Sequence, residues 1–202
     1  MVELKLTERK RAAILAAARE EFLTQGFRET SMDRVAERAE VSKRTVYNHF
    51  ASKEDLFYAI TAGLVEEMHQ AVRTPYSPDK ALEDQLREIA QREIDLVTSE
   101  SYLATFKVLL VESFTVPGVT EAVLASIPQD QDPMKQWIGA AVDDGRLSVD
   151  DVTIAGKHFY SLIKGAFFWP IIVGYGRVPR GKERETLITS SIEMFLDHYR
   201  AN

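Results

Sequence analysis

The chain has 202 residues, of which 45% are hydrophobic, and its formal net charge is −6. This length suits one or two small domains, and the hydrophobic fraction is large enough to form an ordinary globular core. The absence of cysteine excludes disulfides, catalysis by a thiol and metal sites built from thiolates.

The charge is distributed unevenly. Residues 1–53 hold 11 Lys and Arg against 8 Asp and Glu, a net charge of +3, whereas the remaining residues hold 14 against 23, a net charge of −9. Attraction of an anionic partner is therefore restricted to the N-terminal part of the chain. The excess there is small, so binding such a partner would depend on individually placed contacts.

No segment has the length and apolarity that a membrane requires. The first ten residues contain no apolar core of the kind found in signal peptides. The most apolar run, residues 165–174, is well short of the roughly 18 residues that a membrane helix needs. We expect a cytoplasmic protein with no membrane partner.

The first predicted helix spans residues 7–25. Gly26 follows at the position where a glycine commonly ends a helix, because glycine adopts a left-handed conformation at low cost. Apolar residues recur at helical spacing along one face, which consists of Ile14, Ala17, Ala18 and Phe22.

Two short helices follow, joined by a tight connection at residues 39–42. We predict that Thr30 and Asp33 form a capping box at the start of the first of them. Ser42 is placed to cap the second, because its hydroxyl can accept a hydrogen bond from a backbone N–H one turn later. The pair forms a helix-turn-helix unit. Its first helix has an apolar face of Met32, Val35, Ala36 and Ala39.

The second helix of this unit is the most informative segment of the chain. Val46 and Phe50 lie four residues apart and point together into the core. Ser52 and Asp55 form a further capping box, which starts the next helix immediately afterwards. The outward side chains suit a polar, anionic partner, and in a helix-turn-helix unit this helix enters the major groove of double-stranded DNA. These outward residues are Lys43, Arg44, Thr45, Tyr47, Asn48 and His49.

Lysine and arginine also occur on helices that are merely solvated, and taken alone Lys43, Arg44 and Lys53 would indicate nothing more. Their combination with hydroxyl and aromatic side chains and three successive caps favours DNA binding. The three N-terminal helices are expected to pack around Ile14, Phe22, Phe27, Val35, Val46 and Phe50.

Residues 10–60 resemble the TetR family of bacterial transcriptional regulators. As a set, the matching residues are a specific signal, although each piece alone would be weak. They are Phe22-x-x-x-Gly26-Phe27, Thr30-Ser31-Met32, Val35-Ala36, Val41-Ser42, Thr45-Val46-Tyr47-x-His49-Phe50 and Ser52-Lys53-Glu54-x-Leu56.

The resemblance implies roles for individual residues. Tyr47 and His49 would contact backbone phosphates, and Lys53 would bind another phosphate at the start of the connecting helix. Thr45 would face bases or adjacent phosphates. The predicted DNA-binding residues are Ser42, Lys43, Arg44, Thr45, Tyr47, Asn48, His49 and Lys53.

Glu40 departs from the family pattern, which usually has glycine in this turn. Glycine tolerates a positive φ, so a glutamate there predicts a slightly strained or differently shaped turn. This concerns the angle at which the second helix meets DNA rather than the family resemblance.

The rest of the chain is predicted to be helical, so the fold class is all-α. We place a helix-turn-helix DNA-binding domain at residues 1–53 with a connecting helix at 53–73, and an effector-binding and dimerisation domain at 74–202. Thr74–Asp79, with two prolines and a serine, forms the junction. Further helices are predicted at 79–98 and 101–114, from Pro117, from Pro133 after an Asp132 cap to Gly145, at 151–175 with a kink at Pro170, and at 183–200.

The last two helices have broad apolar faces. In the TetR family the last two long helices of each chain form a four-helix bundle with a second copy, so the resemblance implies a homodimer. The alternative is that these faces form only the core of one chain. A dimer is favoured because two helix-turn-helix units about one helical turn of DNA apart read a palindromic operator.

Residues 159–170 also resemble the C-terminal domain of the AefR-like and AcrR-like branch, whose members commonly enclose a small hydrophobic effector. Aromatic residues with a few polar tips suit such a pocket. The alternative is that they are ordinary core residues. The predicted lining is Met68, Tyr102, Phe106, Leu109, Leu110, Trp137, Phe159, Ile163 and Phe168.

Other chemistry has little support. His69, His158 and His198 lack the spacing of a zinc helix, and the acidic residues between Asp130 and Asp151 lack the order of a calcium loop. The sequence contains no phosphate-binding glycine loop and no nucleophile elbow. We therefore expect no metal, no cofactor and no enzymatic activity.

The sequence predicts a transcriptional regulator, most simply a repressor released from a palindromic operator by a small hydrophobic effector. One alternative is an effector-independent DNA-binding dimer that is controlled by a protein partner or acts architecturally. A second is a helical binding or enzymatic domain whose N-terminal part no longer binds DNA.

Overall fold

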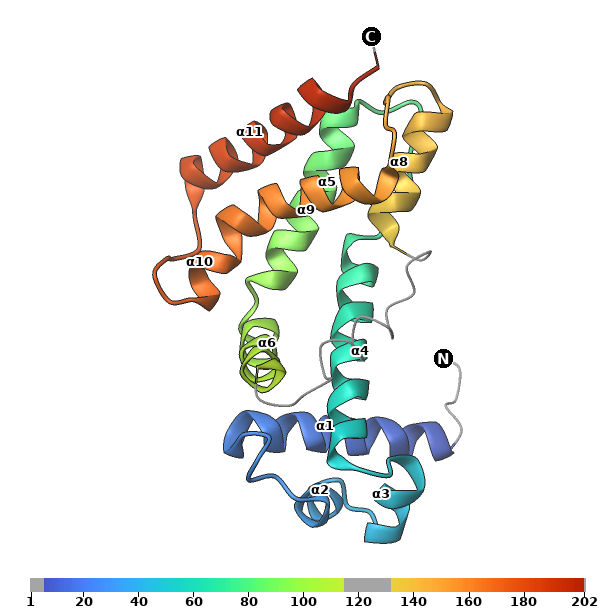
Figure 1. Ribbon diagram of the computed structural model, residues 1–202, viewed down its shortest axis with the longest axis vertical. Helices are drawn as coiled ribbons and strands as arrows, with labels where there is room; N and C mark the ends of the chain where they lie inside the picture. Colours follow the sequence, from blue (N-terminus) through green and yellow to red (C-terminus); the bar gives the residue numbers. More distant parts are fainter. Residues whose placement is uncertain (1–5, 115–131, 202) are drawn as a thin grey trace. The chain divides into compact units, whose positions relative to one another are not determined.

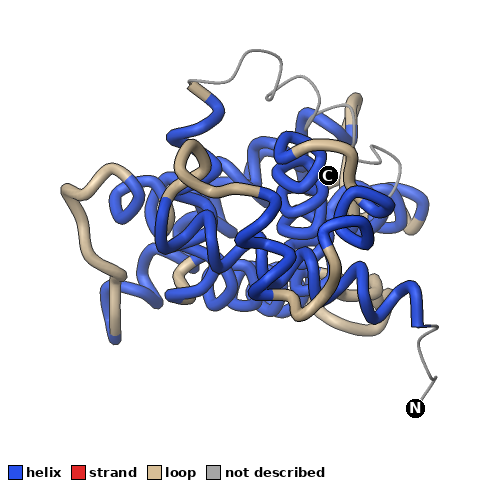
Figure 2. The backbone as a smooth tube through the Cα atoms, turned by 90° about the horizontal axis from the view of Figure 1, so that it is seen from below, coloured by secondary structure: helices blue, strands red, loops and turns tan. Residues whose placement is uncertain are grey.

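The computed structural model describes residues 6–114 and 132–201, and the regular elements within them are helices (Figures 1 and 2). The all-α prediction is confirmed. The helix predicted from Pro117 lies outside the described residues. The helices are α1 (Leu6–Gln25), α2 (Met32–Arg38), α3 (Lys43–His49), α4 (Lys53–Val72), α5 (Leu82–Val97), α6 (Glu100–Ser113), α8 (Pro133–Asp143), α9 (Val152–Phe167), α10 (Trp169–Ile172) and α11 (Gly181–Tyr199).

The chain divides into two compact units. The described residues of Met1–Val65 and Ala104–Ile127 form the first, and those of Glu66–Leu103 and Pro128–Asn202 form the second. Helix α4 therefore contributes residues to both units, as does α6. The predicted domain division after residues 53 and 73 stays a prediction.

The core of the first unit is the one that the sequence predicts. Ile14, Val35 and Val46 are fully buried, and the aromatic residues beside them are at most 5% exposed. Phe27 packs against Phe22 and, edge-on, against Phe57 of α4, with ring centroids 5.2 and 5.3 Å away. Aromatic pairs of this geometry add to the free energy gained by burial alone. These contacts hold α1, the loop after it and the start of α4 together.

Most helix ends follow the predicted caps, with one correction. Helix α1 ends at Gly26, whose φ is +80°, and Ser52 and Asp55 cap α4 reciprocally through two 3.1 Å hydrogen bonds. At α2, however, the cap is Ser31 and not Thr30. The Thr30 hydroxyl instead donates to the Gly26 carbonyl at 2.8 Å, because it is turned back into the loop after α1.

In the second unit, α5, α8, α9 and α11 pack around a common core. Trp137, Phe159 and Phe195 are among its largest buried side chains, and Phe159 meets Phe195 edge-on at 5.4 Å. Asp132 caps α8 and Pro133 occupies its first turn, as predicted. Beyond Gly145, the backbone of the α8–α9 loop pairs with the end of α11, where the Ser148 N–H donates to the Tyr199 carbonyl at 2.8 Å.

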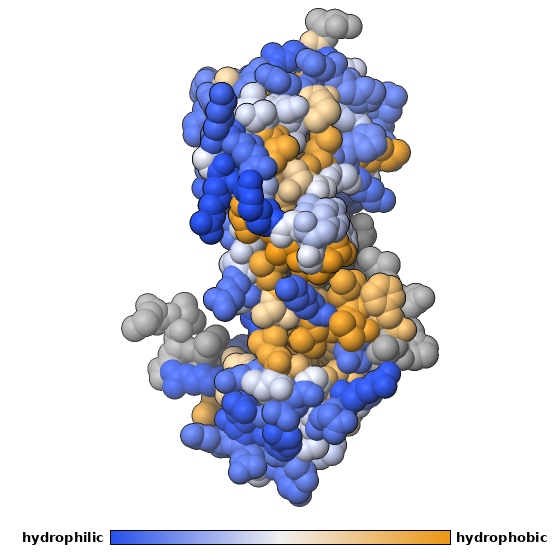
Figure 3. Space-filling model, turned by 90° about the vertical axis from the view of Figure 1, so that its left-hand side faces the viewer, coloured by the Kyte–Doolittle hydropathy of each residue, from blue (hydrophilic) through white to orange (hydrophobic). Residues whose placement is uncertain are grey.

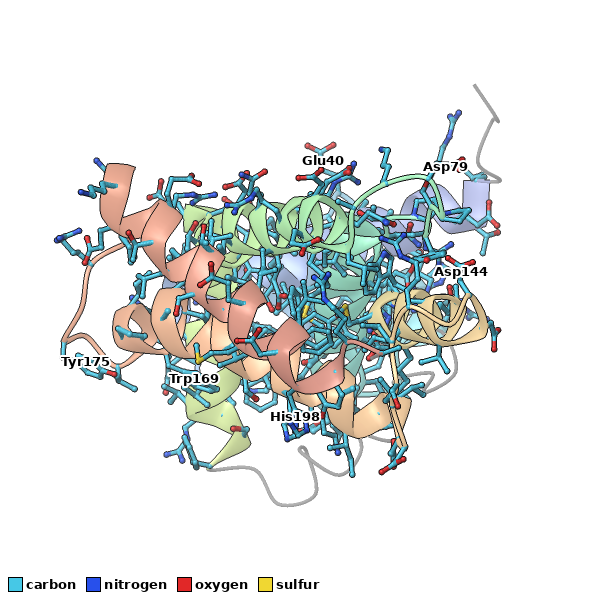
Figure 4. All side chains as sticks on the ribbon, turned by 90° about the horizontal axis from the view of Figure 1, so that it is seen from above. Glu40, Asp79, Asp144, Trp169, Tyr175 and His198 are labelled. Atoms are coloured by element: carbon cyan, nitrogen blue, oxygen red, sulfur yellow. The ribbon has the colours of Figure 1, made fainter. Side chains whose placement is uncertain are left out.

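The helix predicted from 151 to 175 with a kink at Pro170 is wrong in form. Helix α9 ends at Phe167, and a separate short helix, α10, begins at Trp169. The break comes before the proline because a proline fits the first turn of a new helix, where its missing N–H is not needed. After α10 the Pro170 carbonyl accepts from the N–H groups of Tyr175 and Gly176, and Tyr175 projects outward (Figure 4).

Candidate nucleic-acid interface

Helix α3 presents the predicted polar face. Its inward residues, Val46 and Phe50, are at most 5% exposed. The Ser42 hydroxyl accepts a 3.1 Å hydrogen bond from the Thr45 N–H and lies 2.8 Å from the Thr45 hydroxyl. The surface near α2, at the lower end of Figure 3, is largely hydrophilic. Ser42, Lys43, Arg44, Tyr47 and Asn48 are exposed, whereas Thr45 and His49 are half-buried.

Lys53 stands at the start of α4, beside this face. Its ammonium donates to the Arg28 carbonyl at 2.9 Å and lies 4.5 Å from the centre of the Phe27 ring. The contact with the Phe27 ring restrains the Lys53 ammonium, and a helix N-terminus attracts anions. Lys53 is therefore held where a phosphate could replace the carbonyl as its partner.

The turn between α2 and α3 is strained at the predicted residue. Among the non-glycine residues of the described chain, Glu40 has a positive φ, +52°. The Val41 N–H returns to the Ala36 carbonyl at 3.0 Å, which closes the end of α2 and requires this left-handed residue. The turn thus has the shape that a glycine would adopt without strain.

A buried carboxylate that the sequence analysis missed holds α2 against α1. Glu21 is 2% exposed, its Oε1 accepts from the Arg38 Nε at 2.7 Å, and its Oε2 lies 3.2 Å from the Arg34 Nε. Glu21 stands three residues after Ala18 and four after Ala17, on the apolar stripe of α1. A charge on such a stripe is the signal that could have identified it.

The nine predicted pocket residues fall in both units. Trp137, Phe159 and Ile163 belong to the core of the second unit, and the Trp137 indole donates to the Gln85 amide oxygen at 3.3 Å. Tyr102 and Phe168 meet edge-on at 6.1 Å, and the Met68 sulfur lies 3.4 Å from the Lys164 ammonium. Phe106, Leu109 and Leu110 belong to the first unit, where Leu109 lines a hollow of about 10 Å³. The predicted pocket stays a prediction.

The second unit contains a buried ion pair that the sequence analysis also missed. Glu93 of α5 is fully buried, and its Oε1 lies 3.3 Å from the ammonium of Lys164 on α9. Burial raises the pKa of Glu93 to about 7, although the Lys164 charge opposes this. Glu93 follows Ile89 by four residues and Leu86 by seven, so it too stands on an apolar stripe.

The predicted dimer helices, α9 and α11, border an open groove of about 450 Å³. Apolar residues on these two helices remain half exposed, notably Ile154 at 49% and Met194 at 51%. His158 lies 2.6 Å from the Tyr199 hydroxyl through its Nδ1, so this histidine has a partner within the chain. The groove is lined by His158, Ser161, Leu162, Met194, Phe195, His198 and Tyr199.

Two further observations concern the described part of the chain. It contains no cluster of three or more histidine, aspartate or glutamate side chains arranged to hold a metal ion. None of its helices is both long and apolar enough to cross a membrane.

Family comparisons match both parts of the chain. Residues 14–60 match the bacterial regulatory proteins of the tetR family, and residues 84–201 match the C-terminal domain of the AefR-like transcriptional repressors. A TetR family regulator from Pseudomonas syringae of known structure is 34% identical, with coverage of 98% of this chain and 100% of that one and a TM-score of 0.76.

Two other relatives bear on function. The flavonoid-responsive regulator FrrA is 27% identical over 96% of this chain and 98% of its own, with a TM-score of 0.79. The transcriptional activator FasR of Mycolicibacterium smegmatis is 39% identical over 71 residues. That match spans 33% of this chain and only 32% of FasR.

Proposed function

Because this chain belongs to the TetR family of DNA-binding transcriptional regulators, we propose that it binds a palindromic operator as a homodimer and is released by a small hydrophobic effector. Its function is regulatory and not enzymatic. The face of α3 is the observation that carries the proposal. Five of its predicted contact residues are exposed while Val46 and Phe50 anchor the helix from behind.

The proposed contacts divide into two kinds. Tyr47, His49 and Lys53 bind phosphates and set the position of the helix on the duplex, a task that carries no sequence information by itself. Arg44, Thr45 and Asn48 are placed to reach base edges in the major groove, where arginine and asparagine make bidentate pairs. Sequence specificity therefore depends on the exposed middle of α3.

The proposed dimer uses α9 and α11. Ile154 and Met194 would be removed from water by the same helices of a second copy, across a symmetric interface. A dimer presents two copies of α3, so the operator would contain two half-sites about one helical turn apart. Since such a protein acts on chromosomal DNA, we place it in the cytoplasm.

The proposed effector binds in the second unit. FrrA is flavonoid-responsive, which supports a small organic molecule as the signal for this chain as well. To release the operator, the effector must bind the DNA-free arrangement more tightly than the DNA-bound one, since equal affinities shift no equilibrium. Helix α4 has residues in both units and is the element through which binding would act. Repression is the proposed outcome, as in the AefR-like repressors that the C-terminal domain matches.

One observation favours the alternative of a DNA-binding dimer controlled by a protein partner. Trp137, Phe159 and Ile163 are at most 2% exposed and form part of a continuous core. Residues that fill a core this completely leave little room for a ligand at their own positions. An effector that changes operator affinity with no other protein present would exclude this alternative.

The first experiment is selection of bound duplexes from a random pool at a stated salt concentration. We expect a palindrome with half-sites about one turn apart. With that operator, Tyr47→Phe and Lys53→Met should each weaken binding to all duplexes, and Lys53→Met should reduce the salt slope by about 1. Tyr175→Phe and Lys182→Met repeat these changes at exposed positions of the second unit and should leave binding unchanged. Wild-type affinity and salt slope in both test variants would contradict the phosphate contacts.

A further inference from the structure

A carboxyl–ammonium pair with unused hydrogen-bonding capacity, Glu93 and Lys164, lies inside the second unit. Neither oxygen of the buried Glu93 side chain has a hydrogen-bond partner among the residues that the structure describes. The Lys164 ammonium lies 3.3 Å from Oε1 as an ion-pair contact. A carboxylate can accept about four hydrogen bonds, so most of the accepting capacity of Glu93 is unused.

Such an arrangement is costly as pure structure. Removing a carboxylate and an ammonium from water is repaid only when the pair is well aligned and other hydrogen bonds complete it. Replacing a buried ion pair by apolar residues of similar volume is often neutral or stabilising. The pair therefore calls for a role other than stability, and a bound polar group would supply the missing hydrogen bonds.

The partly exposed member of the pair, Lys164, lies beside an aromatic ring. The Lys164 side chain is 23% exposed, and its ammonium lies 5.1 Å from the centre of the Tyr160 ring. Asp132, which caps α8, lies close enough to Tyr160 to accept its hydroxyl at 3.4 Å. A polar group that reaches Glu93 past Lys164 would thus pass beside the Tyr160 ring, whose face suits an aromatic ligand.

We propose that Glu93 and Lys164 bind the hydroxyl group of an aromatic effector, which donates its proton to the Glu93 carboxylate and accepts a hydrogen bond from the Lys164 ammonium. The assignment rests on the effector-controlled function proposed above and names the chemistry of that effector. It also defines Glu93 as the residue that selects a hydroxylated ligand over one without a donor.

Only a group that both donates and accepts satisfies both members of the pair. An ammonium on the ligand would donate to Glu93 but would meet the positive charge of Lys164. A carboxylate on the ligand would accept from Lys164 but would meet the negative charge of Glu93. A hydroxyl serves both without adding a charge to a site that is already neutral as a pair.

The titration of neighbouring groups agrees with this assignment. Burial raises the pKa of Tyr102 to about 12 and the pKa of Tyr160 well above its ordinary value, so both remain neutral hydroxyls near pH 7. The raised pKa of Glu93 leaves part of the population protonated at that pH. A donor on the ligand favours the ionised carboxylate, so binding is expected to strengthen as pH rises from 6 to 8.

The test uses four probes on one scaffold: naphthalene, 2-naphthol, 2-naphthoate and 2-naphthylmethylamine. Thermal unfolding of the full chain measures binding, and release of the labelled operator measures the response. The variants are Glu93→Gln, which mimics the protonated acid, and Lys164→Met. Glu88→Gln is the matched control, because Glu88 lies on the same helix and pairs with Arg92 at the surface.

We expect 2-naphthol to raise the melting temperature and to release the operator at lower concentration than the other three probes. Glu93→Gln and Lys164→Met should each weaken its effect roughly tenfold to a hundredfold, the range for loss of one hydrogen bond to a charged group. Glu88→Gln should respond as the wild type does. Glu88→Gln should also leave operator affinity without probe unchanged, and the affinity of each test variant without probe is the baseline against which its response is measured.

Three results would overturn the assignment. One is a 2-naphthol response that is equal in the wild type and both test variants. Another is a stronger response to 2-naphthylmethylamine, 2-naphthoate or naphthalene than to 2-naphthol. That result would leave the effector-controlled function intact but would assign it an effector with a different functional group. The third is no response to 2-naphthol in the wild type. Loss of operator binding by the wild type itself would instead contradict the proposed function.

Discussion

The Lys43 ammonium lies 2.5 Å from the Asp33 carboxylate, so the first cation of α3 is already paired with α2. Both side chains are more than half exposed. An exposed pair of this kind contributes little to stability, about 0.2–1 kcal/mol. We expect a larger effect on DNA binding, because Asp33 is a negative charge at the edge of the face that is proposed to approach phosphates.

We expect Asp33→Asn to tighten operator binding a few-fold at low salt, with the gain shrinking as salt increases. The release of Lys43 adds one cation to the binding face. Fluorescence anisotropy with the selected operator measures the change. Glu37→Gln removes the same charge one turn further along α2, and an equal gain in that variant would show that net charge, not the Lys43 pair, is responsible.

Glu40→Gly should raise the free energy of unfolding by about 0.5–1 kcal/mol. A left-handed conformation costs a non-glycine residue about 1–2 kcal/mol, part of which is offset by the greater freedom of glycine in the unfolded chain. Glu37→Gly places glycine inside α2 and should lower stability by about 1 kcal/mol. Urea unfolding compares the two, and a change of the same sign in both would contradict strain at Glu40.

Glu21→Gln should destabilise the first unit by about 1–2 kcal/mol. The substitution keeps the shape of the side chain but removes the charge that holds two arginines of α2, Arg34 and Arg38. The arginines are partly exposed and can return to water, which keeps the loss below that of a fully buried pair. Glu20→Gln, at the neighbouring exposed residue, should cost less than 0.5 kcal/mol. Equal losses in thermal unfolding would contradict a special role for Glu21.

Glu93 should make the stability of the second unit depend on pH. Its pKa is about 7 in the folded chain and 4.5 when exposed, so between these values the folded state holds a proton that the unfolded state has released. Stability therefore falls as pH rises from about 5 to 8, by roughly 3 kcal/mol at most. The charged and titratable groups that act on Glu93 are Lys164, Asp132 and Tyr102.

The check is to compare Glu93→Gln with the wild type across this range. Glutamine does not titrate, so the variant should gain stability relative to the wild type as pH rises. Glu88→Gln should follow the wild-type curve. Parallel curves for Glu93→Gln and the wild type would mean that the carboxyl titrates as an exposed one does.

The sequence predicted the helices of the first unit well because each of their ends is set by local chemistry. Ser42 and the Ser52–Asp55 pair act within one turn of themselves, and Gly26 needs only its own backbone freedom. Thr30 was misassigned because its hydroxyl has two possible partners close in sequence. The choice between them depends on how the loop after α1 folds.

Local sequence patterns could not predict two features. One is the break between α9 and α10, and the other is the burial of two carboxylates. Pro170 indicates that a helix is interrupted, but not whether it bends or restarts. Glu21 and Glu93 interrupt the apolar faces of their helices, and the sequence does not show which residues pair with them. Those partners, Arg38 and Lys164, are 17 and 71 residues further along the chain.

Helix α4 is long, so tilting it about one end displaces the other end. Its 20 residues rise to a length of about 30 Å. An unbroken helix of this size bends little, so it acts as a lever. By geometry alone, a rotation of about 5° moves the far end by roughly 3 Å, close to the rise of one base pair. In the proposed mechanism, a small change in the packing of its last turns would therefore be enough to move α3 out of register with the groove.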